Sequence, residues 1–124
     1  MRIELDKHNL PKIVDLETFC QVLFEKEYEQ KIAKIILEET AKNGQAFLIK
    51  NPYGGKTIMN LVKQEISPTI SPNIVSRVWK TLRQNGLLYK PKKAAPVKLS
   101  KHFSKLLKKI ADYWENYVET KKIK

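Results

Sequence analysis

The segment 71–86 carries the signals for both ends of one helix, and it constrains the fold more than any other part of the chain. Ser71 can cap a helix N-terminus, and Pro72 suits the first helical position. Gly86 follows Asn85 at the other end, where glycine is favoured just past a helix C-terminus. Apolar residues recur between these signals at the spacing of one helix face: Val75, Trp79 and Leu82. We therefore expect a helix of about four turns with one buried side.

The opposite side of this helix is rich in amide and basic side chains. Its members are Asn73, Ser76, Arg77, Lys80 and Gln84, with Arg83 at the edge. Side chains of these types donate hydrogen bonds to base edges and to phosphates. Taken alone, the pattern fits either an ordinary solvated helix face or a surface that reads nucleic acid.

The distribution of charge favours the second interpretation. The chain of 124 residues has a net charge of +11, but residues 1–49 hold 7 Lys and Arg against 9 Asp and Glu. Residues 50–111 hold 14 basic residues against a single acidic one, Glu65, while residues 112–124 hold three of each. A solubilising surface would scatter its charge, whereas an excess in one contiguous half is typical of nucleic-acid binding.

Length and composition indicate one domain with its own hydrophobic core. No apolar run approaches the roughly 18 residues that span a membrane, and the N-terminal residues lack the apolar stretch of a signal peptide. Cys20 is the only cysteine, so an intrachain disulfide is excluded and a reducing compartment is expected. These features predict a cytoplasmic protein.

The N-terminal half is predicted to be helical after an arm formed by residues 1–15. Asp15 is the expected N-cap, and a helical apolar stripe follows: Leu16, Phe19, Cys20, Leu23 and Phe24. Cys20 lies inside this stripe and is expected to be a small buried hydrophobe. A second apolar set, Tyr28, Ile32, Ile35 and Ile36, carries the pattern to Asn43. One long helix and two helices joined near Glu27 are both compatible with this pattern.

The letters GGKT at positions 54–57 look like part of a phosphate-binding loop. That motif needs a glycine five residues before Gly55, where this chain has Lys50. Nucleotide binding is therefore rejected, because the cradle of backbone amides has no basis without that glycine. Instead we expect Thr57 to cap the next helix and Lys56 to contact a DNA phosphate.

Two helices separated by a short turn are expected in the middle of the chain. A β-prone run at 46–50 precedes a turn and then a helix from about 58 to 66, which ends before Pro68. About four residues separate it from the helix that begins at Ser71. This arrangement predicts a helix-turn-helix with the basic helix second.

Residues 87–99 are expected to form a small hairpin with Pro91 and Pro96 bordering its tip. Its basic side chains are Lys90, Lys92, Lys93 and Lys98. A hairpin at this place either is a solubilising loop or forms a wing beside the helix-turn-helix.

The final helix, from about Ser100 to Thr120, has a broad apolar and aromatic face. Its members are Phe103, Leu106, Leu107, Ile110, Tyr113, Trp114 and Tyr117. Either the helix covers its own domain or it pairs with a second copy, and we favour a homodimer. Lys101, Lys105, Lys108 and Lys109 either extend the basic surface or are simply solvated.

The order of elements over residues 28–99 resembles the winged helix-turn-helix family. The match is strongest in V-S-R-x-x-x-x-L-x-x-x-G-L-L: Val75, Ser76, Arg77, Leu82, Gly86, Leu87 and Leu88. With the long aromatic helix added, the plan is similar to PadR-type regulators and to the small DNA-binding partition proteins of archaeal plasmids. The fold expected is mainly α with a small β-hairpin wing. Residues 16–99 would form the winged domain with an extra N-terminal helix, and residues 100–124 a dimerisation helix.

The resemblance implies that helix 71–85 enters the major groove, with Asn73, Ser76, Arg77, Lys80 and Gln84 toward the bases. Phosphate or wing contacts would come from Lys56, Thr57, Arg83, Lys90, Lys92, Lys93 and Lys98. The function expected is that of a dimeric transcriptional regulator that reads an inverted repeat in double-stranded DNA without a cofactor. The resemblance also implies association with a nucleoid or a plasmid.

Two alternatives stay open. The first is a plasmid partition or architectural protein that spreads along DNA, for which the footprint would grow with protein concentration. The second is a winged assembly module that binds another protein through the acidic N-terminal half. An enzyme is not expected, because the two histidines lie far apart in sequence and no metal-ligand or nucleophile motif occurs.

Overall fold

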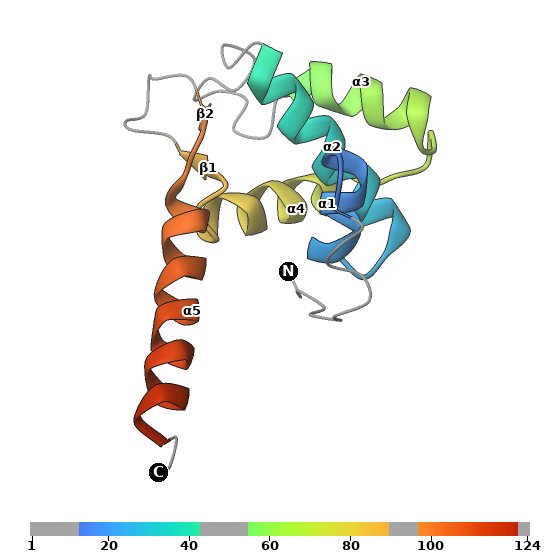
Figure 1. Cartoon of the computed structure of the whole chain (residues 1–124). Helices are drawn as coiled ribbons and strands as arrows, with labels where there is room; N and C mark the ends of the chain where they lie inside the picture. Colours follow the sequence, from blue (N-terminus) through green and yellow to red (C-terminus); the bar gives the residue numbers. More distant parts are fainter. Residues whose placement is uncertain (1–12, 43–54, 90–96, 122–124) are drawn as a thin grey trace.

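A computed structural model describes residues 13–42, 55–89 and 97–121, with backbone only for 55–57. These residues are 75% helical and contain five helices and a two-stranded antiparallel hairpin, which confirms the expected mainly helical class (Figure 1). The elements are α1 (Leu16–Leu23), α2 (Glu27–Lys42), α3 (Gly55–Glu65), α4 (Pro72–Gln84), β1 (Leu88–Tyr89), β2 (Lys98–Leu99) and α5 (His102–Lys121). The predicted N-terminal arm, the β-prone run at 46–50 and the hairpin tip lie wholly or mostly outside the described residues.

The N-terminal half forms two helices rather than one. Asp15 caps α1: its Oδ1 accepts from the Thr18 backbone N–H at 2.8 Å, and Thr18 Oγ1 accepts from the Asp15 N–H at 3.1 Å. The Asp15 carboxylate accepts from the Thr18 backbone N–H and also from the Thr18 hydroxyl, and these two bonds lower the pKa of the carboxyl. The chain is extended at Phe24, and the Gln30 side chain donates to the freed Phe24 carbonyl at 2.8 Å. The same amide also donates to the Glu25 carbonyl at 3.4 Å. The break thus has side-chain donors for its free carbonyls and contains no glycine or proline.

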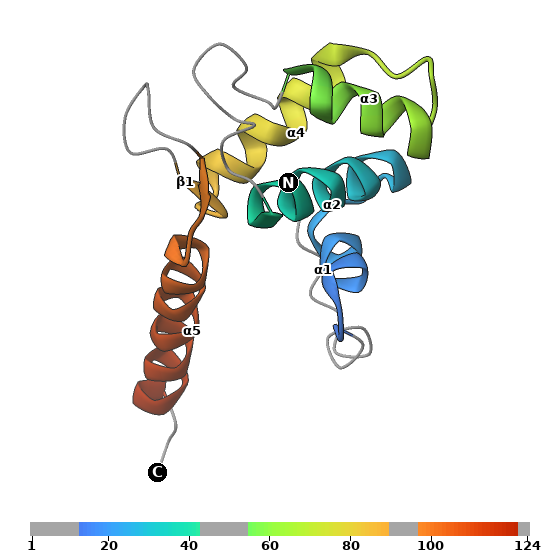
Figure 2. The ribbon, with the colours of Figure 1, turned by 90° about the horizontal axis from the view of Figure 1, so that it is seen from above.

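Helix α2 is the centre of the core. It packs against α1, α3, α4 and β2, and Figure 2 shows it beside these helices. Ile32, Ala33 and Ile36 are completely buried on it. The buried Thr40 hydroxyl donates to the Ile36 carbonyl at 2.7 Å, so its polar group is satisfied inside the helix.

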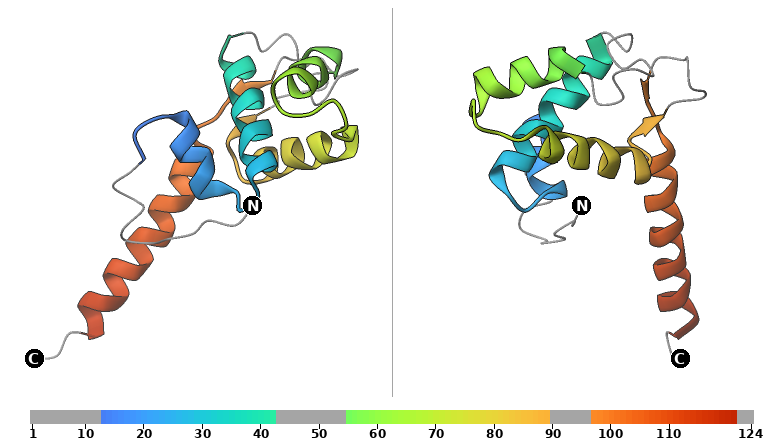
Figure 3. Two further views of the ribbon diagram at one scale, coloured as in Figure 1. Left: turned by 90° about the vertical axis from the view of Figure 1, so that its right-hand side faces the viewer. Right: turned by 180° about the vertical axis from the view of Figure 1, so that it is seen from behind.

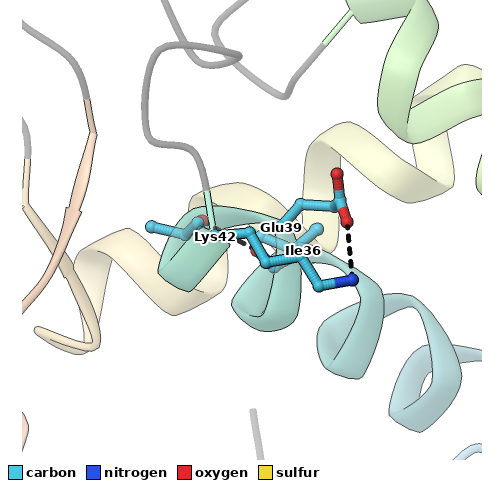
Figure 4. Close-up of polar contacts among 4 residues, drawn as sticks. Ile36, Glu39 and Lys42 are labelled. Atoms are coloured by element: carbon cyan, nitrogen blue, oxygen red, sulfur yellow. Dashed lines mark hydrogen bonds and ion pairs between the residues drawn. The ribbon is translucent and has the colours of Figure 1, made fainter.

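The end of α2 carries a local ion pair. Lys42 Nζ lies 3.7 Å from Glu39 Oε2, one turn apart on the helix (Figure 4). The Lys42 side chain is well exposed, so the pair adds little to the stability of the fold.

Cys20 is part of the core, as the sequence predicted. Its side chain is 1% exposed, and burial raises the pKa of its thiol to about 12. The thiol therefore packs as a hydrophobe and stays protonated near neutral pH.

Helix α3 begins at Gly55, three residues before the expected start. The prediction that Thr57 caps this helix is wrong, because Thr57 lies inside the first turn. Glycine costs a helix only about 1 kcal/mol relative to alanine, so Gly55 does not prevent the turn from forming. At the other end the N–H groups of Ile66 and Ser67 both donate to the Val62 carbonyl, and residues 66–71 lead into α4.

The hairpin is short, and it connects α4 to α5. Leu88 pairs with Leu99 and Tyr89 with Lys98 in antiparallel register. The Ser100 N–H donates to the Leu87 carbonyl at 2.9 Å, which extends the pairing by one residue toward α5.

Helix α5 extends away from the other helices, as Figure 3 shows in two views. No residue of α5 is buried. Near its start the Phe103 ring packs edge-on against the Phe19 ring of α1, with 6.4 Å between centroids. The sequence left two arrangements open for this helix. The structure shows that the helix does not cover its own domain.

Candidate nucleic-acid interface

Both ends of α4 are fixed by the residues that the sequence indicated. Ser71 is the N-cap, and its Oγ accepts from the Asn73 N–H at 3.1 Å with Pro72 in the first turn. At the C-terminal end the Asn85 side chain donates to the Thr81 carbonyl at 2.8 Å. Gly86 follows with φ +83°, a left-handed conformation that other residues rarely adopt.

One side of α4 belongs to the core. Val75 and Leu82 are completely buried, while Val78 is 1% and Trp79 3% exposed. Burying side chains of this size contributes roughly 1.5–3 kcal/mol each. This side packs against α2, so only the opposite side of α4 is available to a ligand.

The opposite side carries the predicted base-reading residues. Asn73, Arg77, Lys80 and Gln84 are exposed, and Ser76 is half-buried at the margin. The spacing of 4, 3 and 4 residues places the four exposed side chains along one line about 16 Å long. The structure therefore presents them together, with Ser76 less accessible than the rest.

Arg83 lies at the edge of this line and is partly immobilised. Its guanidinium carbon is 5.5 Å from the centroid of the Trp79 ring, within the range of a cation–π contact. The Trp79 Nε1 is buried and has no hydrogen-bond partner among the described residues.

The predicted phosphate contacts are only partly visible. Lys56 and Thr57 fall in the first turn of α3, where the side chains are not described, and Lys90, Lys92 and Lys93 lie outside the described residues. Lys98 is exposed on β2, opposite Tyr89. Tyr89 is 54% exposed and was not predicted as a surface residue; the alternation of Leu88 and Tyr89 in the strand was the available signal.

The predicted dimerisation residues share an exposed face on α5. The exposed fractions are 38% for Leu106, 41% for Leu107, 66% for Ile110, 69% for Tyr113, 61% for Trp114 and 43% for Tyr117. Tyr117 stacks on Trp114 with 5.6 Å between ring centroids and on Tyr113 with 6.3 Å. Phe103, the seventh residue of this set, is half-buried against α1.

An apolar groove of about 490 Å³ lies at the base of α5, between α1 and α2. Leu16, Phe19, Leu37 and Leu99 line it together with Phe103. Because Phe103 also begins the apolar face of α5, the face and the groove form one continuous surface. Leu16 and Phe19 belong to the apolar stripe that was expected in the N-terminal half, and they extend the surface onto α1.

Within residues 13–42, 55–89 and 97–121, no group of three or more His, Cys, Asp or Glu side chains is arranged to hold a metal ion. None of the helices in these segments combines the length and apolarity needed to cross a membrane. Comparison of the chain with models of protein families, with curated proteins and with solved structures found no match.

Proposed function

We propose that the protein is a cytoplasmic, site-specific DNA-binding regulator that acts as a homodimer. The observation that carries this proposal is the two-sided construction of α4. One side is fully buried on α2, and the other presents an exposed line of amide and cationic side chains. Such a helix can enter a major groove while the rest of the domain holds its orientation.

The charge around α4 favours a surface that binds nucleic acid over an ordinary solvated helix face. Helix α4 contains no acidic residue, and Glu65 is the only one in residues 50–111. Within the described segments, no ion pair is recorded for Arg77, Lys80 or Arg83. Cations gathered without carboxylate partners repel one another, and a polyanion relieves this repulsion.

The order of elements supports the winged helix-turn-helix arrangement. A short connection joins α3 to α4, and an antiparallel hairpin follows α4 directly. In this arrangement α4 is the recognition helix and the hairpin is the wing, with Lys98 directed at the DNA backbone. The fork of Arg77 suits guanine, and the amides of Asn73 and Gln84 suit adenine.

The exposed apolar face of α5 supports a dimer in which two α5 helices pair. The exposed apolar face of α5 is larger than a single surface helix normally carries, and it continues into the groove beside α1. A second copy of this chain is the proposed occupant, because its own α5 offers a matching apolar face. A symmetric dimer would read an inverted repeat with half-sites about one helical turn apart.

The test is binding of duplex DNA by the full chain across a range of salt concentrations. The logarithm of the affinity is expected to fall linearly with the logarithm of salt concentration, because phosphate contacts release counterions. Lys80→Ala is expected to weaken binding, whereas Lys31→Ala on α2 serves as a charge-matched control and is expected to have no effect. An affinity that does not change with salt would disprove the proposal.

A second function is favoured by an acidic groove on the other half of the domain. This groove, of about 450 Å³, lies between α1, α2 and the end of α3. Five carboxylates line it, together with two lysines: Glu17, Glu25, Glu27, Glu38, Glu65, Lys31 and Lys34. A protein partner with a basic segment would fit this surface, and the domain would then serve as an assembly module without salt-sensitive DNA affinity.

A further inference from the structure

We propose that a pocket between the end of α4, the hairpin and the start of α5 binds a backbone phosphate of DNA. This inference rests on the proposed DNA-binding function and adds a second contact region to it. The pocket has a volume of about 540 Å³ and is lined by Arg83, Tyr89, Ser100, Lys101, His102 and Lys105, with Gly86 and Leu88 beneath them. We call it the junction pocket.

The charge of the junction pocket identifies the ligand as an anion. Arg83 comes from α4, Lys101 from the residue before α5, and Lys105 from the first turns of α5. No carboxylate lines the pocket, and no ion pair is recorded for these three cations among the described residues. A phosphate suits this set, because the Arg fork can bind two of its oxygens and each Lys supplies a point charge.

The frame of the pocket is rigid. The Phe103 N–H donates to the Gly86 carbonyl at 3.1 Å, and the Ser100 N–H donates to the Leu87 carbonyl at 2.9 Å. Gly86 has φ +83°, and a Cβ at this position would lie 2.9 Å from His102 Cδ2. The cation–π contact with Trp79 restrains Arg83 before any ligand binds. Less conformational entropy is then lost when an anion enters.

The position of the pocket fits a phosphate at the side of the groove that α4 occupies. Arg83 follows Ser76 by seven residues, so both lie on the same edge of the exposed side of α4. The major groove is about 12 Å wide and an α-helix with side chains is about 10–12 Å across. Side chains at the helix edge therefore meet the phosphates that border the groove, whereas those at its centre meet the bases.

The pocket also stays accessible in the proposed dimer. Lys105 follows Phe103 by two residues, which is about 200° around the helix. Lys105 thus lies on the opposite side of α5 from its apolar face. A second copy that covers this face leaves the junction pocket open to DNA.

The experiment compares two double variants of the full chain in a DNA-binding titration against salt. The first double variant, Lys101→Ala with Lys105→Ala, removes two of the three cations that line the pocket. We expect about tenfold weaker binding for all duplex sequences alike, and a salt slope smaller by about 1–2. Lys108→Ala with Lys109→Ala is the matched control, because these lysines lie one turn further along the same side of α5 and do not line the pocket. The control is expected to bind like the wild type.

Each other outcome has a distinct meaning. Equal losses in both double variants would overturn the pocket, since they would show a general electrostatic field. No loss in either, while Lys80→Ala weakens binding, would overturn the pocket and leave the proposed function standing. A wild type without salt-sensitive DNA affinity would overturn both. Thermal unfolding with inorganic phosphate is a further measurement. If phosphate strongly stabilises the wild type and not the pocket variant, the pocket binds a small phosphorylated ligand, and its assignment to the DNA backbone is overturned.

Discussion

Helices α4 and α5 have similar sequence patterns and opposite surroundings. Each carries a continuous apolar face and a basic opposite face. On α4, Val75, Val78, Trp79 and Leu82 are 0–3% exposed, because α2 and the rest of the core cover them. In α5 the corresponding residues from Leu106 to Tyr117 are 38–69% exposed. An apolar face therefore shows that a helix needs a partner, but not whether the same chain provides it.

This difference assigns separate roles to the two helices. Because one side of α4 is part of the core, mutations on that side should unfold the domain, whereas mutations on the exposed side should change ligand binding. The domain contacts α5 mainly at its first turn, through Phe103 and the bonds at Gly86. Changes further along α5 should alter association between copies and leave the fold intact.

The largest expected effect is the loss of stability in Leu82→Ala. Leu82 is completely buried, so truncation leaves a cavity and should cost about 3 kcal/mol of unfolding free energy. Urea unfolding followed by circular dichroism measures the change. Leu107→Ala in α5, where the side chain is 41% exposed, should cost less than about 1 kcal/mol in dilute monomer. Equal losses in the two variants would show that α5 is covered by its own domain.

The next effect is the loss of association in Ile110→Asp. Ile110 is 66% exposed at the middle of the apolar face of α5, and a carboxylate there would have to be desolvated between two helices. The dimer dissociation constant measured by analytical ultracentrifugation should rise about 30-fold or more, which corresponds to roughly 2 kcal/mol. Lys109→Asp, on the basic side of the same helix, is the control. A variant that still dimerises with the affinity of the wild type would contradict the assignment of this face.

A smaller effect is expected for Arg77→Ala, which changes only the exposed side of α4. Loss of a bidentate contact with guanine should weaken specific DNA binding by about 1–3 kcal/mol and relax the preference at that base. Selection of bound sites from random DNA measures both changes. Stability and the dimer constant should stay at wild-type values. If binding to all sequences weakens equally, Arg77 contacts a phosphate and does not read a base.

A further comparison of the two helices uses the Cys20 thiol, which reports whether the core opens. Alkylation requires the thiolate, and burial holds the pKa near 12, so the folded wild type should react only through opening. Ile110→Asp should leave the labelling rate unchanged, whereas Leu82→Ala should raise it about 100-fold if opening follows the loss of stability. A faster rate in Ile110→Asp would show that α5 stabilises the core.

The same pKa shift predicts a dependence of stability on pH. The pKa of the folded thiol, about 12, lies above its ordinary value of 9.0. The stabilisation is therefore complete below about pH 9 and is lost as the pH rises toward 12. Unfolding free energies of the wild type and Cys20→Ala should converge over this interval. Parallel curves would mean that the thiol does not titrate differently in the two states.

Some of the structure followed directly from local signals in the sequence. The ends of α4 were predictable because Ser71, Pro72 and Gly86 act on their immediate neighbours. Its buried side followed from the spacing of Val75, Trp79 and Leu82. The pattern left open one long helix or two helices joined near Glu27, and the structure has two. Helical periodicity could not decide this, because the contact of the Gln30 side chain with the Phe24 carbonyl joins residues six positions apart. The start of α3 at Gly55 was also missed, because glycine permits a helical turn as readily as it ends one.

The sequence alone determined the mainly helical class, the position and the two faces of α4, and the concentration of positive charge in residues 50–111. These properties depend on residues close together in the chain, where capping and helical periodicity operate. Only the tertiary structure decided that the apolar face of α5 stays exposed and that Arg83 meets Lys101 and Lys105 in one pocket. Both depend on the direction in which α5 leaves the hairpin. That direction is set by hydrogen bonds to Gly86 and Leu87, between segments that no short-range pattern connects.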